Sequence, residues 1–203
     1  MTNSDLIRQL QNRGVLRTPE IIAAFKAVDR GDFIPVDLKS EAYDDHPLPL
    51  GFGSTISQPW TVAFMFELLE PKTGNRILDV GSGSGWTTAI LSSIVGGAGR
   101  VVGIERIPEL VLRGRENLAK YAIQNAEIKN AGEDLGFPSA GPYERILVSA
   151  AADNLPESLV GQLKEDGILV IPIRSQIWRV QKHPDGLDIK KYDGFAFVPL
   201  IER

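Results

Sequence analysis

The sequence predicts an α/β protein built on a mostly parallel, doubly wound sheet. Three observations lead to this expectation. Apolar strand-like runs alternate with helical patterns from Pro59 onward, a glycine-rich turn joins one strand to the next helix, and the end of the chain changes to a strand–turn–strand pattern. Alternating strands and helices form parallel sheets with helices on both faces. We therefore expect a parallel sheet that finishes in an antiparallel hairpin.

The first thirty residues predict two helices. Apolar residues from Leu6 to Leu10 keep the spacing of one helical face, and Gly14 ends that helix. Thr18 is predicted as the N-cap of the second helix, because Pro19 suits the first helical position.

The segment from Arg30 to Gln58 is expected to carry little regular structure, because prolines and glycines interrupt any long element. Loops of this length are usually functional or disordered. Phe33, Tyr43 and Phe52 make it too apolar for free disorder. We interpret it as an irregular segment packed over the rest of the protein.

The remaining elements follow from periodicity and turn residues. Helices are expected over residues 59–70, 86–95, 108–123 and 156–163. Strands are expected over residues 76–80, 100–104, 126–130, 143–149, 167–173, 176–182, 187–191 and 195–201. The turn at 183–186 predicts that strands 176–182 and 187–191 form a hairpin.

Composition excludes several kinds of chemistry. The 203 residues include no cysteine and two histidines, so thiolate metal sites, disulfides and cysteine nucleophiles are excluded and no metal site is expected. The net charge of −4 argues against binding nucleic acid by charge. The first residues do not resemble a secretory leader, so none is expected, and no apolar run approaches the roughly 20 residues of a membrane span. We expect a cytoplasmic monomer without membrane or nucleic-acid partners.

The strongest chemical signal is a glycine-rich turn between a strand and a helix. Asp79 precedes it, Gly81, Gly83 and Gly85 form it, and Trp86 opens the helix. Glycines let the backbone approach a ligand, and N–H groups at a helix N-terminus face it, so a nucleotide-like group is favoured over a turn that binds nothing. The dinucleotide fingerprint needs glycine where Trp86 stands, which disfavours a nicotinamide dehydrogenase.

Glu105 ends the next strand, where a carboxylate can accept both hydroxyls of an adenosine ribose; a solvated strand-end charge is the alternative. The loop after Asp79, Glu105 and the antiparallel end together resemble the class I methyltransferases that depend on S-adenosylmethionine (AdoMet). The resemblance implies a Rossmann-like fold, with AdoMet as cofactor and S-adenosylhomocysteine (AdoHcy) as product.

A more specific resemblance lies before the first core helix. The run from Ser54 to Pro59, S-T-I-S-Q-P, closely resembles the hallmark of protein-L-isoaspartate O-methyltransferases. Further motifs that resemble this family are 43–45, 47–51, 142–143, 149–151, 159–167 and 197–200, so the likeness runs from about Leu6 to Ile201. It implies methylation of the free α-carboxylate of isoaspartyl residues in damaged proteins and peptides. The ester then collapses to a succinimide, which starts repair.

The resemblance assigns Ser57 as the catalytic residue, whose hydroxyl orients the attacking carboxylate. The residues alone favour a helix N-cap for Ser57, and one serine can do both. Cofactor contacts are expected from Thr55, Asp79, Gly81, Ser82, Gly83, Gly85, Glu105, Arg106, Gly132 and Glu133. Substrate contacts are expected from Ser54, Ile56, Val198 and Leu200, the last two along a strand edge that pairs with peptide backbone.

The region around Glu133 departs from the family pattern. Gly132-Glu133-Asp134 stands where the family has Gly-Asp-Gly, so either acid could meet the adenine amino group. Two alternatives stay open: a relative that methylates a normal aspartate of a dedicated peptide, and an AdoMet-binding protein without catalysis. We expect one domain over residues 1–203, with 1–58 as a helical and loop extension on the substrate side and 59–203 as the core.

Overall fold

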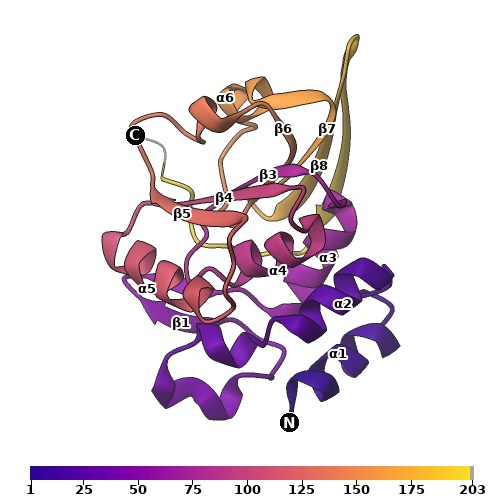
Figure 1. The fold of residues 1–203 in the computed structure, drawn as a ribbon. Helices are drawn as coiled ribbons and strands as arrows, with labels where there is room; N and C mark the ends of the chain where they lie inside the picture. The colour runs from indigo at the N-terminus through magenta and orange to yellow at the C-terminus, as the bar shows by residue number, and fades with distance from the viewer. Residues whose placement is uncertain (202–203) are drawn as a thin grey trace.

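The computed structural model describes residues 1–201. Within this range one sheet has seven strands, in the order β5-β4-β3-β6-β7-β8-β9 (Figure 1). In chain order they are β3 (Arg76–Val80), β4 (Arg100–Glu105), β5 (Ala126–Asn130), β6 (Tyr143–Val148), β7 (Leu163–Ile173), β8 (Gln176–His183) and β9 (Gly186–Asp193). The pairs from β5 to β7 are parallel, and β8 and β9 add to β7 as an antiparallel hairpin. The predicted fold class is confirmed.

Both faces of the sheet are buried, and each has its own core. Successive strand residues point to opposite faces, so Ile77 joins one cluster and Leu78 the other. The helices are α3 (Pro59–Leu69), α4 (Trp86–Val95), α5 (Pro108–Ala119) and α6 (Glu157–Gly161). Figure 1 shows α3, α4 and α5 on one face and α6 on the other. Near-continuous apolar strands are typical of sheets covered in this way.

The first 58 residues are more regular than predicted. Their helical elements are α1 (Asn3–Asn12), α2 (Pro19–Ala27), η1 (Arg30–Phe33) and η2 (Val36–Glu41). The segment expected to be irregular also contains an antiparallel hairpin, β1 (Leu48–Gly51) with β2 (Ser54–Ile56). These strands are three or four residues long, too short for a clear alternation of polar and apolar residues.

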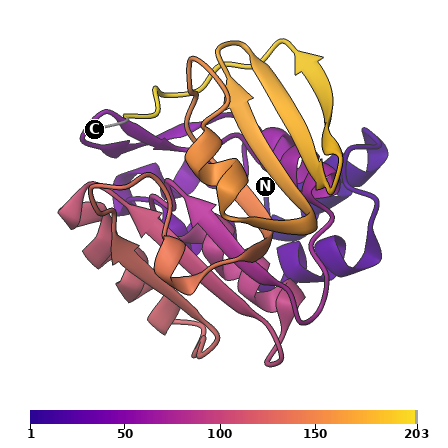
Figure 2. The same cartoon turned by 90° about the horizontal axis from the view of Figure 1, so that it is seen from above.

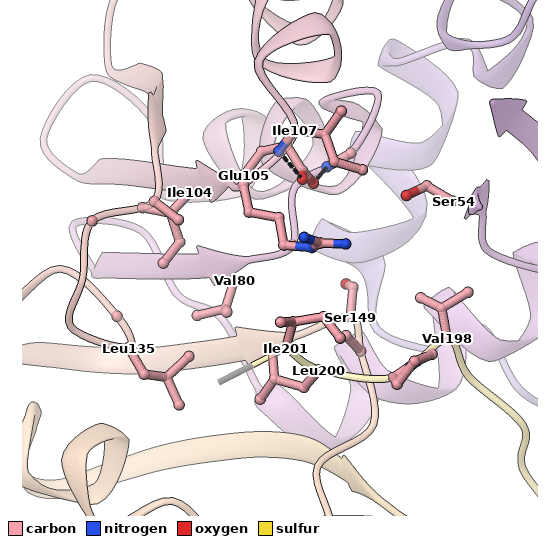
Figure 3. A pocket seen from close by; sticks show the side chains of 18 of the residues that line it. Ser54, Val80, Ile104, Glu105, Ile107, Leu135, Ser149, Val198, Leu200 and Ile201 are labelled. Atoms are coloured by element: carbon pink, nitrogen blue, oxygen red, sulfur yellow. Dashed lines mark hydrogen bonds between the residues drawn. The ribbon is translucent and has the colours of Figure 1, made fainter. Parts of the chain in front are cut away.

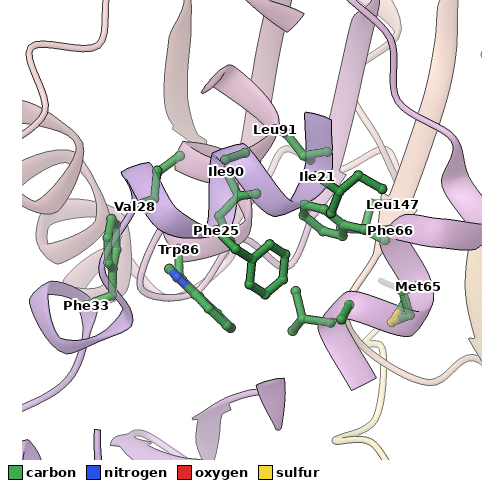
Figure 4. Packing of buried hydrophobic residues seen from close by; sticks show 14 of the residues in the cluster. Ile21, Phe25, Val28, Phe33, Met65, Phe66, Trp86, Ile90, Leu91 and Leu147 are labelled. Atoms are coloured by element: carbon green, nitrogen blue, oxygen red, sulfur yellow. The ribbon is translucent and has the colours of Figure 1, made fainter. Parts of the chain in front are cut away.

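An aromatic cluster joins this extension to the core. Phe25 on α2 meets the rings of Phe66 on α3 and Trp86 on α4, edge to face, at centroid distances of 6.0 and 5.7 Å (Figure 4). Such pairs stabilise beyond the area that they bury. The extension therefore shares the core on the α3–α4 face of the sheet.

Helix α2 begins at Pro19 with Thr18 at the N-cap position, as predicted, but the Thr18 side chain does not cap it. The buried carboxylate of Glu67 on α3 accepts hydrogen bonds from the backbone N–H groups of Arg17 and Thr18, each at 2.8 Å. Its second oxygen accepts from the Thr18 hydroxyl, also at 2.8 Å. The N-terminus of one helix is thus held by a residue 49 positions away.

The expected strand over 195–201 is wrong. Pro199 forms a single parallel bridge with Ala151, in which Ala151 N–H donates to Val198 O (2.8 Å) and Leu200 N–H donates to Ala151 O (2.7 Å). Proline has no N–H to continue a ladder, so the segment stays a tail beside the sheet.

Other expected boundaries differ by a few residues. Helix α5 ends at Ala119, four residues before its expected end, and Ala122 just beyond it is left-handed (φ 49°). Strand β7 begins four residues earlier than expected. Within residues 1–201, no helix combines the length and apolarity that crossing a membrane requires.

Candidate functional site

A cavity of about 500 Å³ lies at the carboxyl ends of β3, β4 and β6. Val80, Glu105 and Ser149 bring these strand ends to its wall (Figure 3). The β1–β2 hairpin and residues 198–201 of the tail line it as well. Figure 2 shows the tail reaching the hairpin, from which it is far apart in sequence. Parallel α/β sheets bind ligands at this edge, where the strand order reverses beside β3.

The glycine turn after β3 forms part of the wall. Gly83 lines the cavity in a left-handed conformation (φ 51°) that glycine adopts without strain. Gly85 lies outside the lining, and a Cβ there would come within 3.0 Å of Ile128 Cδ1 and 3.2 Å of Gly114 O. A glycine is therefore needed at position 85 because the start of α4 packs closely on α5 and β5.

Glu105 is a buried carboxylate in the cavity wall, with 7% of its surface exposed, whereas Glu133 and Asp134 in the same wall are exposed. Its Oε2 accepts from Gly83 N–H at 3.1 Å and its Oε1 from Ile107 N–H at 2.9 Å (Figure 3). A carboxylate has about four lone-pair sites. Each oxygen can therefore accept a further hydrogen bond from a ligand hydroxyl.

Asp79 lies behind the glycine turn and is fully buried. Its Oδ2 accepts from the hydroxyls of Thr87 (2.7 Å) and Thr88 (2.6 Å), while its Oδ1 has no partner among residues 1–201. Burial raises the pKa of Asp79 to about 6, and Glu105 adds to the shift, against the two hydroxyl hydrogen bonds. The aspartate is thus an incompletely satisfied acid directly beneath the loop.

A smaller cavity, of about 20 Å³, adjoins the first. Its volume suits about one water molecule. Thr55, Gly81 and Gly83 line both spaces, and Ser57 lines the smaller one. Two further lining residues are buried and carry polar atoms without a partner among residues 1–201: Ser82 Oγ and Trp86 Nε1.

Ser57 is not the N-cap of α3. The cap position belongs to Gln58, because Pro59 takes the first helical position. The N-cap interpretation of Ser57 is therefore wrong by one residue. Ser57 is free of that role and lines the small space beside the glycine turn.

The cavities bring together most of the predicted site residues. The large cavity is lined by Ser54, Thr55, Gly81, Gly83, Glu105, Arg106, Gly132, Glu133, Val198 and Leu200. The small cavity adds Ile56, Ser57 and Ser82. Asp79 and Gly85 lie outside both linings. Asp134 lines the large cavity beside Glu133, so both candidates for the adenine contact remain.

Sequence reasoning missed Phe52, Ser149 and Ile201 as lining residues. Ser149 had a usable signal, since it follows β6 at the edge where Val80 and Glu105 end their strands. Phe52 and Ile201 are exposed apolar residues whose place depends on how the hairpin and the tail pack.

Comparisons with known proteins agree on one family. The family model described as protein-L-isoaspartate(D-aspartate) O-methyltransferase matches residues 1–203. A protein-L-isoaspartate O-methyltransferase from Ignicoccus hospitalis is 43% identical over 98% of this chain and 97% of its own. Another from Methanopyrus kandleri is 43% identical over 97% of this chain and 89% of its own.

Solved structures agree with the sequence comparisons. A crystal structure described as a putative protein-L-isoaspartate O-methyltransferase from Plasmodium falciparum, in complex with S-adenosyl-L-homocysteine, has a TM-score of 0.89 at 28% identity. The match covers all of both chains. The similarity therefore includes the extension and the tail as well as the sheet.

Proposed function

The chain belongs to the protein-L-isoaspartate(D-aspartate) O-methyltransferase family, and from this premise we propose how its cavity performs the reaction. The enzyme transfers a methyl group from AdoMet to the free α-carboxylate of L-isoaspartyl residues in damaged proteins and peptides. The resulting ester starts repair through a succinimide. AdoMet would supply the methyl group in activated form, on a sulfonium whose leaving group is the neutral thioether AdoHcy.

The residues of the large cavity fit this cofactor. Its volume of about 500 Å³ falls in the range of small-molecule sites. In the proposal, Glu105 accepts the ribose hydroxyls through the lone pairs that its backbone contacts leave free. Gly81 and Gly83 let the backbone approach the ligand, with Asp79 fixing the turn from below. Glu133 or Asp134 meets the adenine amino group.

The shared lining of the cavities carries the assignment of Ser57. Because Thr55, Gly81 and Gly83 line both spaces, Ser57 lies next to the turn that is proposed to approach the cofactor. In the proposal its hydroxyl donates to the substrate carboxylate and fixes the attacking oxygen in line with the methyl group. A carboxylate is already ionised at neutral pH, so placement is needed rather than a general base.

The wall formed by the hairpin and the tail is proposed to receive the peptide. The hairpin is the part of the extension 1–58 that lines the cavity, which agrees with the expected place of this extension on the substrate side. Val198 O and Leu200 N–H are already bonded to Ala151, so this edge of the tail is occupied. In an extended segment, the backbone N–H and C=O groups of successive residues point to opposite edges. The carbonyl of Pro199 therefore faces the free edge and can accept from peptide backbone, which suits an enzyme that accepts many sequences.

The test is Ser57→Ala, assayed on an isoaspartyl peptide and its normal aspartyl twin. We expect kcat on the isoaspartyl peptide to fall about 10- to 100-fold, because the attacking oxygen loses its fixed position. AdoHcy affinity, measured by calorimetry, should stay within about threefold. Ser93→Ala is the matched control, since Ser93 is exposed on α4 away from the cavities.

Two outcomes would contradict these assignments. Loss of AdoHcy binding in Ser57→Ala would make Ser57 part of the cofactor site. Equal methylation of the aspartyl twin by the unaltered enzyme would favour the alternative of a normal aspartate substrate.

We further propose that the enzyme works as a cytoplasmic monomer that binds neither nucleic acid nor membrane. The net charge of −4 supports the absence of a nucleic-acid partner, and a chain without cysteine needs no oxidising compartment. Size-exclusion chromatography with light scattering tests the monomer. A dimer at micromolar concentration would contradict it.

A further inference from the structure

Arg30 is a charged residue buried in the extension, with none of its surface exposed. Its guanidinium donates to backbone carbonyls of four residues within the described chain: Ala42 (2.7 Å), Asp44 (3.3 Å), His46 (3.0 Å) and Ser57 (3.3 Å). Burial lowers the pKa of Arg30 to about 10, so it remains charged at neutral pH. A buried charge is costly unless hydrogen bonds compensate it. Here backbone carbonyls accept from both terminal nitrogens, Nη1 and Nη2, while Nε has no partner among residues 1–201.

The same guanidinium also contacts the cofactor side of the site. Arg30 Cζ lies 5.6 Å from the ring centroid of Trp86, within the range of a cation–π interaction. Trp86 is the first residue of α4, directly after the glycine turn. One side chain therefore touches both the Ser57 peptide and the helix that carries the turn, and Ser57 and Trp86 both line the small cavity.

The carbonyls that Arg30 holds belong to a segment that in turn holds the start of α3. Within this segment, Asp45 Oδ1 accepts from Trp60 N–H at 2.8 Å. Gln58 Nε2 donates to the Asp45 carbonyl at 3.0 Å. Ser57 is therefore fixed directly through its own carbonyl and indirectly through the next residues, and both routes lead back to Arg30.

The other end of α3 offers an internal comparison. Arg145 and Arg179 are 8% and 9% exposed, and both also donate to backbone carbonyls. Arg145 Nε donates to Glu70 O and Arg179 Nε to Leu68 O, each at 3.0 Å. Neither arginine lines either cavity. They anchor the same helix by the same chemistry, away from the site.

We propose that Arg30 is a positioning residue for methyl transfer, which holds the Ser57 peptide at a fixed distance from the glycine turn. This inference rests on the proposed role of Ser57. Arg30 lines neither cavity. In this role it acts through the Ser57 backbone and the Trp86 ring. Its guanidinium fork is needed because one ammonium group cannot reach all of these carbonyls and lie over the indole.

The test compares Arg30→Lys with Arg145→Lys, alone and combined with Ser57→Ala. We expect Arg30→Lys to lower kcat on an isoaspartyl peptide by about tenfold or more, because small misplacements of reacting groups are costly. AdoHcy affinity should stay within about threefold. Arg145→Lys should lower the unfolding midpoint to a similar degree but keep kcat within about twofold of the unaltered enzyme. In the Ser57→Ala background, Arg30→Lys should have no further effect on kcat.

Each contrary outcome has a separate meaning. If Ser57→Ala lowers kcat but Arg30→Lys does not, or if the two reductions multiply, the positioning role is overturned and that of Ser57 stands. If Ser57→Ala keeps full kcat, the catalytic role of Ser57 is overturned, and this inference with it.

Should Arg30→Lys not fold, Arg30→Gln carries the same test. The glutamine amide is uncharged and cannot donate to the carbonyls of Ala42, His46 and Ser57 together. The same fall in kcat, absent in the Ser57→Ala background, is expected. A kcat within about twofold of the unaltered enzyme would overturn the inference.

Discussion

The two walls of the cavity are built in different ways. One wall consists of the ends of β3, β4 and β6, strands of a sheet that is buried on both faces. Val80 and Glu105 lie in its parallel ladders, and Ser149 N–H donates to Val80 O. The opposite wall consists of residues 52–55 of the hairpin and 198–201 of the tail, which carry no charged side chain. The difference teaches that charge and regular sheet pairing are concentrated on the proposed cofactor side, while the proposed peptide side is neutral and is formed by a short hairpin and an irregular tail.

The largest expected effect tests the charged wall. Glu105→Ala should weaken AdoHcy binding by about 100-fold, because hydrogen bonds to a charged group contribute about 1.5–3 kcal/mol each. The KM for the peptide at saturating AdoMet should stay within about threefold. Calorimetry and initial rates measure these quantities, with Glu109→Ala as an exposed control on α5. An unchanged AdoHcy affinity would contradict the assignment of the charged wall to the cofactor.

The second prediction concerns the stability of the charged wall and its pH dependence. The pKa of Asp79 is raised to about 6 from an ordinary value of 3.8, so the folded state binds its proton more tightly than the unfolded state. Stability is therefore lost as pH rises from about 4 to about 6, and the loss is complete above that range. Asp79→Asn escapes it, because the amide does not ionise.

We expect Asp79→Asn to raise the free energy of unfolding by about 2 kcal/mol at about pH 7.5 without ligand. Urea denaturation measures this quantity, and the variant should unfold at a higher urea concentration than the unaltered protein. One pKa unit corresponds to about 1.4 kcal/mol, and the unpartnered amide of asparagine offsets part of the gain. The difference should shrink at about pH 4.5. An equal difference at both pH values would show that the charge of Asp79 is not its cause.

The smallest expected effect lies on the neutral wall. Phe52, at the tip of the hairpin, is 57% exposed and lines the cavity. Phe52→Ala should raise the peptide KM about threefold, because an apolar contact of this size is partly lost, and leave AdoHcy affinity unchanged. Val36→Ala is the control, since Val36 is 85% exposed and outside the lining. A larger change in AdoHcy affinity than in the peptide KM would contradict the assignment of this wall to the peptide.

The same two walls differ in how far the sequence predicts them. The expected bounds of β3 and β5 agree with the structure to the residue, and those of β4 and β6 to within one, because apolar runs between turn residues are typical of buried strands. Glu105 and the glycine turn follow from those bounds. The pattern of residues along the chain is therefore sufficient to place this half of the site.

The neutral wall depends on packing between distant segments, which has no local signal. The β1–β2 hairpin was missed because its strands are very short and its tip places Phe52 in a left-handed conformation (φ 57°). The tail resembles a strand through its apolar residues, but Pro199 limits it to one bridge. The cap of α3, by contrast, has a local signal: the rule that makes Thr18 an N-cap also makes Gln58 one, ahead of Pro59.

The hydrogen bonds from Glu67 to the start of α2 couple the local unfolding of α2 to that of α3. Because Glu67 belongs to α3, Thr18 at the N-cap of α2 and Arg17 before it lack this hydrogen-bond acceptor until α3 has docked. Short helices are marginal on their own in water. We expect amide protons of α2 and α3 to exchange with solvent as one cooperative unit. A fluctuation that frees the N-terminal helices would then also release the helix that follows Ser57, so the lifetime of the extension limits that of the competent enzyme.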